Sequence, residues 1–581
     1  MLATSGALTA LSRLNSGGSA LFATKEIDME SIWLKHYPKG VPACIDVQEF
    51  SSLCDVLQQS CQRFGDLPAY SNMGSTLSYG KLERASRDFA AYLQKVLGLK
   101  KGDRVALMMP NLLQYPVALF GVLRAELVVV NVNPQYTAPE LAHQLKDSGA
   151  VAIVVLENFA HTLQDVLLQN PQLTIAVMTT EVGDLFAMVK EVFTNMVVKY
   201  AKKLVPAWTI SGSIEFNAAL RAGHALALDA VVLTHNDMAF LQYTGGTTGT
   251  IKGAVLTHGN MVASLLQLSA WIGINLEDGK EVFICPLPLY HIYALTSSLV
   301  FMKIGAHAVL ITNPRDMHAF IHELKRYRFT AIIGVNTLYR TLLDAPEFAL
   351  VDTGALKLSN AGGMAVQRVV AEAWKKATGV PIIESYGLTE ASPGVTSNPL
   401  NIEDWTGDIG LPFPSTQVRV VDDNDVEVAS GQVGEICVRG PQVMAGYWNQ
   451  PQETAHVFTA DGWLRTGDMG LMNEAGSLRI TDRKKDIIIV SGFKVFPNQI
   501  EDVVASHLGV LEVGAIGVPN EHSGESVKIV VVKRDPSLTE QDLLDHCRQH
   551  LTGYKMPSIV EFRVNPLPKS NIGKILRRQL R

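Results

Sequence analysis

The chain has 581 residues, of which 47% are hydrophobic and 18% are charged. This length exceeds what one hydrophobic core usually serves, so we expect at least two domains, and the composition excludes a disordered protein. A net charge of −6 gives no reason to expect a nucleic-acid partner. The six cysteines lack CxxC spacing, which favours reduced thiols in a cytosolic protein and argues against a zinc site.

The N-terminal residues do not read as part of the globular chain. Residues 1–24 are rich in Ser, Ala and Leu and contain Arg13 but no acid, which loosely resembles a transit peptide. A disordered or untranslated extension over residues 1–28, ahead of a start at Met29, is the alternative that we favour. No segment predicts a transmembrane helix, since the strongest apolar region, 105–132, is interrupted by polar residues and prolines. Peripheral membrane contact stays open, because an apolar substrate could bring the protein to a membrane.

Helical and strand patterns alternate from Ser51 onward. Apolar spacing predicts helices over 81–96 and 140–147, and buried strands over 104–109, 127–132 and 151–155. Residues 180–225 are less patterned and suggest an inserted helical segment. Further strands are expected over 238–241, 282–285, 308–311, 331–333 and 380–383. This alternation predicts an α/β fold with largely parallel sheets and βαβ-type subdomains.

The pattern changes in the last third of the chain. Short β segments with Gly and Asp turns over 418–438 suggest a small β-rich subdomain. The charged run 482–486 suggests a boundary, which divides a large domain, 29–482, from a small α+β domain, 483–581. In the small domain we expect strands over 487–490, 514–518 and 527–532, and helices over 501–507 and 540–551.

The most informative stretch is Tyr243-Thr-Gly-Gly-Thr-Thr-Gly-Thr-Ile-Lys-Gly-Ala-Val-Leu-Thr-His258. Glycines let backbone N–H groups approach an anion, threonine hydroxyls add donors, and Lys252 adds a positive charge. Because Gly253 follows the lysine, the stretch is not a Walker A loop. A flexible loop between two strands would need no lysine, so we expect a cradle for nucleotide phosphates.

Three motifs follow, each of which also has a purely structural explanation. His291 sits among aromatic residues, where a satisfied core histidine is the more common case. The bare backbone of Asn360-Ala-Gly-Gly-Met364, after a short strand at 356–358, could accept a flat ligand such as adenine or could form a plain turn. Tyr386-Gly-Leu-Thr-Glu390 offers a stacking ring and a carboxylate for Mg²⁺, although Thr389 and Glu390 could simply begin a helix.

Two further motifs lie nearer the C-terminus. In Asp461-Gly-Trp-Leu-Arg-Thr-Gly-Asp468, followed by Arg483, the second carboxylate could accept both ribose hydroxyls and the arginine could help to hold ribose or phosphate. An ordinary surface ion pair would use the same residues. Lys574, on a loop bounded by Pro and Gly, could move in and out of a site, or it could belong to a basic tail with the arginines that follow it.

In this order the motifs resemble the adenylate-forming superfamily, which includes acyl-CoA synthetases, luciferases and the adenylation domains of peptide synthetases. The chain is most similar to the bacterial long-chain fatty acid–CoA ligases, from about Ile32 to the C-terminus. The most specific part runs from Asp461 through Asp468 to Asp482-Arg-Lys-Lys485 and resembles the signature of fatty acyl-CoA synthetases. One departure is Ala361, where these ligases have a glycine beside Gly362.

The resemblance implies a role for each motif. It implies that the stretch from Thr244 to Lys252 holds the β- and γ-phosphates of ATP, that Thr244 and Glu390 place Mg²⁺, that adenine lies on Gly362, Gly363 and Tyr386, and that Asp468 takes the ribose. Lys574 would stabilise charge during adenylation, Lys485 would be the hinge, and Gly492 would face coenzyme A. The expected catalytic residues are Lys574, Glu390, Thr244, His291 and Arg483, and the expected ATP-binding residues are Tyr243, Thr244, Gly245, Gly246, Thr247, Thr248, Gly249, Lys252, Gly253, Gly362, Gly363, Tyr386, Gly387, Thr389, Asp468 and Arg483.

The implied reaction has two half-steps. A fatty carboxylate attacks the α-phosphate of ATP, and the thiol of coenzyme A then displaces AMP from the acyl-adenylate, which activates fatty acids for β-oxidation or lipid synthesis. The acyl chain would need an apolar tunnel, for which segments 262–274 and 334–336 are candidates, although core packing explains most of their residues. Transfer of the acyl group to a carrier protein or to oxygen, and a catalytically silent binding module, are the alternatives. We expect a cytoplasmic protein, with peripheral contact with the inner membrane and a homodimer both left open.

Overall fold

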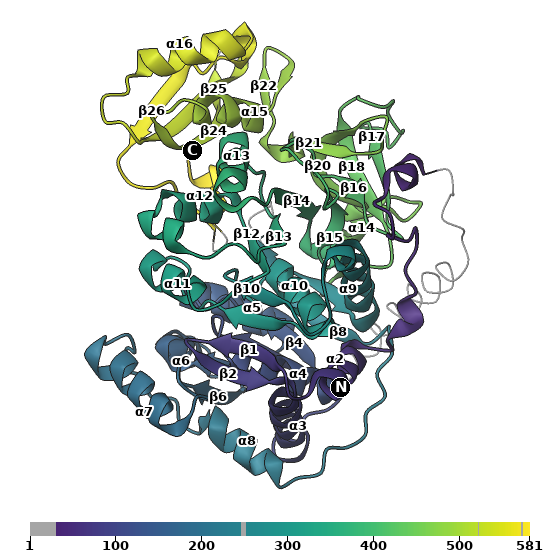
Figure 1. The fold of residues 1–581 in the computed structure, drawn as a ribbon, viewed down its shortest axis with the longest axis vertical. Coiled ribbons are helices and arrows are strands. Elements are labelled where there is room, and N and C mark those ends of the chain that lie inside the picture. Colours follow the sequence, from purple (N-terminus) through teal and green to yellow (C-terminus); the bar gives the residue numbers. More distant parts are fainter. Residues whose placement is uncertain (1–30, 246–250, 521, 571–572, 581) are drawn as a thin grey trace.

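The computed structural model describes residues 31–245, 251–520, 522–570 and 573–580. Within these ranges four sheets form a large α/β part and a smaller α+β part at the C-terminal end, which confirms the expected fold class (Figure 1). The boundary at 482/483 stays a prediction. The sixteen-residue stretch at 243–258 is described only in part, because residues 246–250 lie outside the described ranges.

The first sheet has nine strands, of which the six in the middle run parallel. In spatial order its strands are β16 (Leu411–Pro412), β15 (Gly394–Ser397), β14 (Ile382–Gly387), β13 (Leu358–Ala361), β12 (Ala331–Gly334), β10 (Val282–Cys285), β11 (His307–Leu310), β1 (Pro68–Asn72) and β2 (Ser75–Ser78).

The second sheet has eight strands and also has six neighbouring parallel ones. In spatial order they are β19 (Gly446–Tyr447), β9 (Ile251–Thr257), β8 (Met238–Gly245), β4 (Val128–Asn131), β3 (Arg104–Met108), β5 (Ala152–Leu156), β6 (Ala176–Thr180) and β7 (Ile214–Glu215).

Helices cover both faces of each large sheet, because alternate residues of a strand point to opposite sides. In β3, Val105 and Leu107 pack into the core between the sheets, whereas Ala106 and Met108 pack outward. The inner helices are α2 (Leu53–Phe64), α3 (Tyr79–Lys95), α4 (Gln114–Arg124), α9 (His258–Ile272) and α10 (Ile292–Lys303). The outer ones are α5 (Ala138–Ser148) and α6 (Ala160–Gln169) on the second sheet, and α11 (Met317–Leu324), α12 (Asn336–Asp344) and α13 (Arg368–Thr378) on the first.

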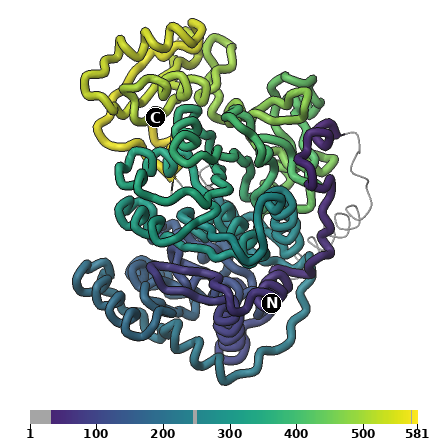
Figure 2. Tube along the Cα trace, in the orientation of Figure 1, coloured from purple at the N-terminus to yellow at the C-terminus, as the bar shows by residue number. Residues whose placement is uncertain are grey.

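A four-stranded antiparallel sheet forms the expected β-rich subdomain, with strands β17 (Gln417–Val421), β18 (Gly434–Arg439), β20 (Leu464–Met472) and β21 (Leu478–Arg483). Helix α14 (Pro451–Val457) precedes β20. Figure 2 shows the first described residues running along this side of the molecule, and the Tyr37 hydroxyl donates to the carbonyl of Pro412, in strand β16 of the nine-stranded sheet, at 2.5 Å.

The C-terminal part has its own hydrophobic core and its own sheet. Its strands are β22 (Ile488–Val490), β23 (Phe493–Val495), β24 (Val510–Asn520), β25 (Gly524–Lys533) and β26 (Ile559–Arg563), and its helices are α15 (Pro497–Ala505) and α16 (Glu540–His550). The expected strands and helices of this part are therefore confirmed, with shifts of a few residues at their ends.

Three local expectations need correction. Much of the described part of the stretch at 243–258 is not a loop, because β8 and β9 pair antiparallel with Thr244 opposite Lys252. The strand expected at 356–358 is Leu358–Ala361, so Asn360 lies within a strand between β12 and β14. Segment 180–225 holds helices α7 (Met188–Met196) and α8 (Phe216–His224), but β6 and β7, which add two strands to the sheet edge, were missed.

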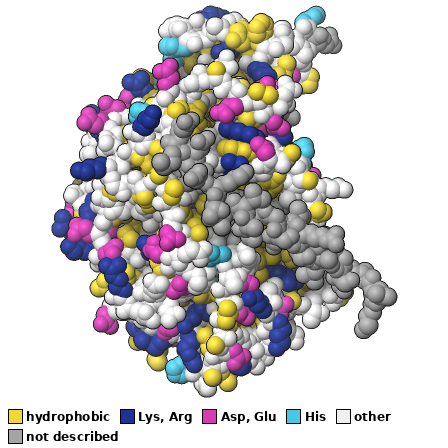
Figure 3. All heavy atoms as spheres, turned by 90° about the vertical axis from the view of Figure 1, so that its right-hand side faces the viewer, with side chains coloured by type: hydrophobic (Ala, Val, Ile, Leu, Met, Phe, Trp, Pro, Cys, Tyr) yellow, Lys and Arg dark blue, Asp and Glu magenta, His cyan; other side chains and the backbone are white. Residues whose placement is uncertain are grey.

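One face of the surface and the helix lengths bear on possible partners. On the side in Figure 3, acidic and basic side chains are interspersed. None of the helices in the described ranges combines the length and the apolar run that a membrane crossing requires.

Candidate active site

A cavity of about 1710 Å³ lies between the large part and the C-terminal part, at the carboxyl ends of strands β12, β13 and β14. This is where open α/β sheets usually bind ligands. The cavity brings together fourteen of the expected site residues: Tyr243, Thr244, Lys252, His291, Gly362, Gly363, Tyr386, Gly387, Thr389, Glu390, Asp468, Arg483, Lys485 and Lys574.

The remaining expected residues do not line the cavity or are not described. Gly253 lies behind the lining, where a Cβ would come within 3.0 Å of the Tyr243 ring. Gly492 has φ +84° in the turn between β22 and β23, with open space around it and outside the cavity lining. Gly245 ends β8. Gly246, Thr247, Thr248 and Gly249 lie outside the described residues.

Asp468 is the centre of one polar group. It stands opposite Arg483 in the β20–β21 pair, and its Oδ1 lies 3.4 Å from the arginine Nε. Its Oδ2 accepts a 2.7 Å hydrogen bond from the Tyr386 hydroxyl, whose pKa is raised by burial and by this carboxylate. The side chain of Asp468 is 10% exposed and that of Arg483 is 41% exposed. The carboxylate is therefore fixed in place and still faces the cavity, as a ribose acceptor would have to be.

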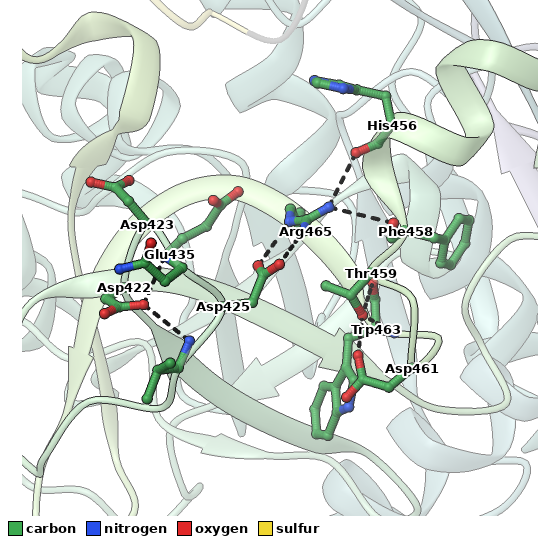
Figure 4. Close-up of polar contacts among 12 residues, drawn as sticks. Asp422, Asp423, Asp425, Glu435, His456, Phe458, Thr459, Asp461, Trp463 and Arg465 are labelled. Atoms are coloured by element: carbon green, nitrogen blue, oxygen red, sulfur yellow. Dashed lines mark hydrogen bonds and ion pairs between the residues drawn. The ribbon is translucent and has the colours of Figure 1, made fainter.

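The rest of the Asp461–Asp468 motif holds the β-rich subdomain together (Figure 4). Asp461 pairs with Arg419 and accepts a 2.6 Å hydrogen bond from the Thr459 hydroxyl, and these two partners lower its pKa to about 2. Arg465 pairs with Asp425 and donates to the carbonyls of His456 and Phe458, both at 3.4 Å. Asp461 and Arg465 therefore have structural partners within the subdomain.

Lys574 enters the cavity from the C-terminal part. Its backbone N–H donates to the Ser570 hydroxyl at 3.2 Å, and the Ser570 N–H donates to the Lys574 carbonyl at 2.7 Å. Burial, followed by the positive charge of Arg483, lowers its pKa to about 8. The preceding Gly573 has φ +83°, and a Cβ there would stand 2.5 Å from the Thr337 hydroxyl of α12. The loop therefore fits tightly against the large part.

Glu390 and Lys252 meet through residues that the sequence did not point to. The Tyr447 hydroxyl donates to Glu390 Oε1 at 2.6 Å, and Lys252 Nζ lies 5.3 Å from the centre of the Tyr447 ring. Lys252 also forms an ion pair with Glu453. Tyr447 reaches this position because β19 pairs with β9. These segments are distant in the sequence, so no local pattern predicts their contact.

His291 is neutral and fixed in place. It caps α10, where its Nδ1 accepts a 3.3 Å hydrogen bond from the Tyr293 N–H, and burial lowers its pKa to about 4. This arrangement leaves Nε2 as the protonated nitrogen. The Nε2–H of His291 can donate a hydrogen bond in the cavity, and the imidazole carries no charge near neutral pH.

A half-buried arginine at the edge of the cavity, Arg577, links the two parts. Arg577 donates to Asp482 at 2.8 Å and to both oxygens of Glu501, at 2.8 and 2.6 Å. The basic-tail alternative is therefore wrong for Arg577, which is a paired interior residue. Next to Asp482, the turn Lys484–Asp486 contains the expected hinge Lys485.

Apolar side chains line one region of the cavity. From the tunnel candidate 262–274 only Leu268, Trp271 and Ile272 line it, and the buried remainder is core. From the second candidate segment, 334–336, Asn336 lines the cavity. The tunnel candidates did not include helix α10 or the expected strand β12, which contribute Ile292, Val300, Phe301 and Ile333 to this lining.

The AMP-binding enzyme family matches residues 57–448, and the AMP-binding enzyme C-terminal domain matches residues 499–574. The chain is 56% identical to a long-chain-fatty-acid–CoA ligase from Escherichia coli O157:H7 over 95% of this chain and 98% of that protein. It is 35% identical to a ligase of the same name from Bacillus subtilis strain 168, over 94% of this chain and 97% of that protein. Among solved structures, ATP-bound MatB from Rhodopseudomonas palustris is similar, with a TM-score of 0.76, 28% identity, and coverage of 91% of this chain and 98% of that chain.

Proposed function

Because this chain belongs to the AMP-binding enzyme family, we propose that its cavity activates a long-chain fatty acid with ATP and transfers it to coenzyme A. The chain is an ATP-dependent, AMP-forming acid–thiol ligase of the long-chain fatty acid–CoA ligase type. The observation that carries the proposal is that Asp468, Arg483, Glu390, Lys252 and Lys574, contributed by distant segments, all line one cavity.

In the first half-step, the residues around the cavity position ATP and neutralise charge. Asp468 is placed to accept the ribose hydroxyls, with Arg483 and Tyr386 holding its carboxylate in place. The backbone at Gly362 leaves a flat surface, where a Cβ would come within 3.3 Å of the Ser385 carbonyl. Lys252 and the neighbouring N–H groups face the β- and γ-phosphates, and Lys574 stabilises the charge that develops as the carboxylate attacks the α-phosphate.

We propose Mg²⁺ as the metal of this half-step. One carboxylate, Glu390, and one hydroxyl, Thr244, line the cavity, and such a sparse oxygen set suits Mg²⁺, which takes its other ligands from water and from substrate phosphates. No cluster of three or more His, Cys, Asp or Glu suited to a metal occurs in the described ranges, which fits a metal that arrives with the nucleotide. When bound, Mg²⁺ would neutralise phosphate charge. Tyr447 orients the Glu390 carboxylate for that role.

In the second half-step the thiol of coenzyme A attacks the acyl carbonyl, a bond to sulfur forms, and AMP leaves with the electrons of the broken acyl–oxygen bond. Gly492 lies outside the cavity in this arrangement. A rotation of the C-terminal part about Lys485 would withdraw Lys574 and bring Gly492 towards the acyl-adenylate. A short hinge that absorbs a domain rotation is common in proteins.

A two-part assay tests the proposed function. With oleate, ATP and Mg²⁺ alone, the purified protein should exchange labelled pyrophosphate into ATP. With coenzyme A added, it should form oleoyl-CoA and AMP in equal amounts. Exchange without any thioester would favour a different acyl acceptor, and the absence of exchange would contradict the proposal altogether.

For location and assembly, we propose a cytoplasmic enzyme that contacts the cytoplasmic face of the inner membrane to collect its lipid substrate. The cysteines of the described residues are all free thiols, in keeping with a reducing compartment. Fractionation of cells at low and high salt would test the location. The homodimer stays a prediction, and sedimentation of the purified protein would test it.

A further inference from the structure

Helix α7 turns a row of large apolar side chains away from the protein. Met188 is 79% exposed, Val189 is 85% exposed and Phe193 is 68% exposed. Val192, Met196 and Tyr200 extend the same row with exposures of 55%, 55% and 69%. At 100° per residue, the five side chains of α7 fall within one continuous sector of the helix, and Tyr200 follows them on the π-helical turn Val197–Ala201. We name these six side chains the α7 face.

The polar side chains of α7 point inward, which reverses the usual order of a surface helix. Asn195 is buried, and its side-chain oxygen accepts a 2.7 Å hydrogen bond from the Gly183 N–H. Glu191 accepts from the Asn217 side chain at 3.1 Å. A surface helix normally buries its apolar side and exposes its polar side. The helix therefore contacts the rest of the protein through polar groups. Core packing does not explain why its apolar side chains lie on the α7 face.

Positive charge lies beside the C-terminal end of this apolar row. Residues 187–204 contain four lysines and one glutamate. Of these lysines, Lys199 forms ion pairs with Glu157 and Glu181 at 3.1 and 3.5 Å. Lys202 and Lys203 follow the helix and are exposed, and no ion pair is recorded for either among the described residues. Lys190, on the helix itself, donates to the Met73 carbonyl at its base. Helix α7 stands at the outer edge of the molecule, away from the C-terminal part, where a flat surface could reach it (Figures 1 and 2).

We propose that the α7 face is a docking surface for a bilayer that contains anionic phospholipid, with the helix lying in the plane of the interface. An apolar row flanked by lysines fits such a surface, because the side chains enter the acyl boundary while the ammonium groups meet lipid phosphates. A second copy of the chain fits less well, since a two-fold contact on this face would bring the lysines of both copies together. The inference extends the membrane contact proposed above by naming the element responsible.

Vesicle binding of the full chain tests the proposal. Vesicles of equal parts phosphatidylglycerol and phosphatidylcholine should pull down the wild-type protein, and binding should weaken in high salt and on pure phosphatidylcholine. The variant Val192→Gln/Phe193→Gln/Met196→Gln should bind at least about tenfold more weakly, because it removes the inserted side chains. The variant Lys202→Glu/Lys203→Glu should lose binding by at least about tenfold as well.

A matched control uses apolar side chains that are equally exposed elsewhere. Leu508 is 90% exposed and Val564 is 97% exposed, and both lie in the C-terminal part. The variant Leu508→Gln/Val564→Gln should bind vesicles as the wild type does. If it weakens binding as much as the α7 variants do, or if the α7 variants bind normally, the α7 face is not the docking surface.

Two further measurements separate this inference from the proposed function. Exchange of pyrophosphate with oleate dispersed in detergent should be unchanged in every α7 variant, since none of the altered residues lines the cavity. Loss of exchange in the wild type would overturn the function, whereas normal exchange without vesicle binding would overturn only the docking surface. If the α7 variants change the sedimentation coefficient instead of vesicle binding, the face joins two copies and the lipid proposal is wrong.

Discussion

Tyr386 and Asp468 join two sheets across the cavity: the hydroxyl at the end of β14 donates to a carboxylate on β20, at 2.7 Å. The contact sets the distance between the nine-stranded sheet, which offers the flat backbone at Gly362, and the β-rich subdomain, which offers the carboxylate. A nucleoside that spans the two would find both of its contacts already in position, so little ordering would be needed on binding.

Asp468→Asn should raise the KM for ATP by about tenfold or more, because a hydrogen bond to a charged group contributes about 1.5–3 kcal/mol. Steady-state kinetics with oleate at saturation would measure this change. The matched control is Asp461→Asn in the same motif, which alters an exposed ion pair with Arg419 and should change KM by less than about threefold. Equal effects in the two variants would remove Asp468 from the nucleotide site.

Lys574→Ala should slow the formation of the acyl-adenylate by about 100-fold or more, since it removes a preorganised positive charge from the reacting phosphate. Transfer from a chemically prepared oleoyl-adenylate to coenzyme A should change little. Rapid-quench measurement of each half-reaction would show this difference. Lys569→Ala, which removes a lysine of the same loop that pairs with Glu512, serves as the control and should leave both half-reactions nearly intact.

The rate of adenylation should fall as the pH rises through about 8. The pKa of Lys574 is lowered from 10.5 to about 8, so the side chain is charged below that pH and neutral above it, and only the charged form can stabilise the phosphate. The pH profile of kcat/KM reports groups of the free enzyme and would show this limb. In Lys574→Arg the limb near pH 8 should disappear, whatever activity remains. An unchanged limb in that variant would assign it to another group.

Gly573→Ala should reduce adenylation, because the new Cβ would meet the Thr337 hydroxyl at 2.5 Å and displace the loop that carries Lys574. Gly462→Ala is the matched control, since Gly462 has a similar φ, +86°, but open space around it. Both variants carry a backbone strain of about 1–2 kcal/mol. Only Gly573→Ala should therefore lose adenylation beyond what its thermal stability explains, and similar activities in the two variants would contradict the close fit.

The sequence predicted the regular elements well where the signal is local. Runs such as Val282–Cys285 are short and apolar and lie between Glu281 and Pro286, and the strand is found there with the same bounds. It also pointed to fourteen residues that line the cavity, most of which carry chemistry in an unusual setting. Gly253 shows the opposite case: its position against the Tyr243 ring is a packing requirement that looks like part of a phosphate-binding motif.

What could not be predicted depends on contacts between distant segments. Glu453 meets Lys252 across 201 positions of sequence, and Tyr447 meets Glu390 only because β19 pairs with β9. The stretch around Thr244 looks like a loop because it is rich in glycine, which is depleted in strands, whereas the ladder with β9 makes its described part a strand. Arg577 lies in a basic C-terminal sequence that is typical of a solvated tail. Its carboxylate partners come from distant segments, so the sequence alone does not reveal them.

The guanidinium of Arg577, which Asp482 and Glu501 share, affects when the C-terminal part can rotate. It holds Asp482, which is 1% exposed, against Glu501 of α15, and the other oxygen of Asp482 accepts from the Asn498 N–H at 2.7 Å. Any swing about Lys485 that separates these groups leaves a carboxylate without its cation until water or another cation reaches it. The interval between the two half-reactions would then depend on how quickly this one arginine releases its carboxylates, so that an ion pair sets the pace of the cycle.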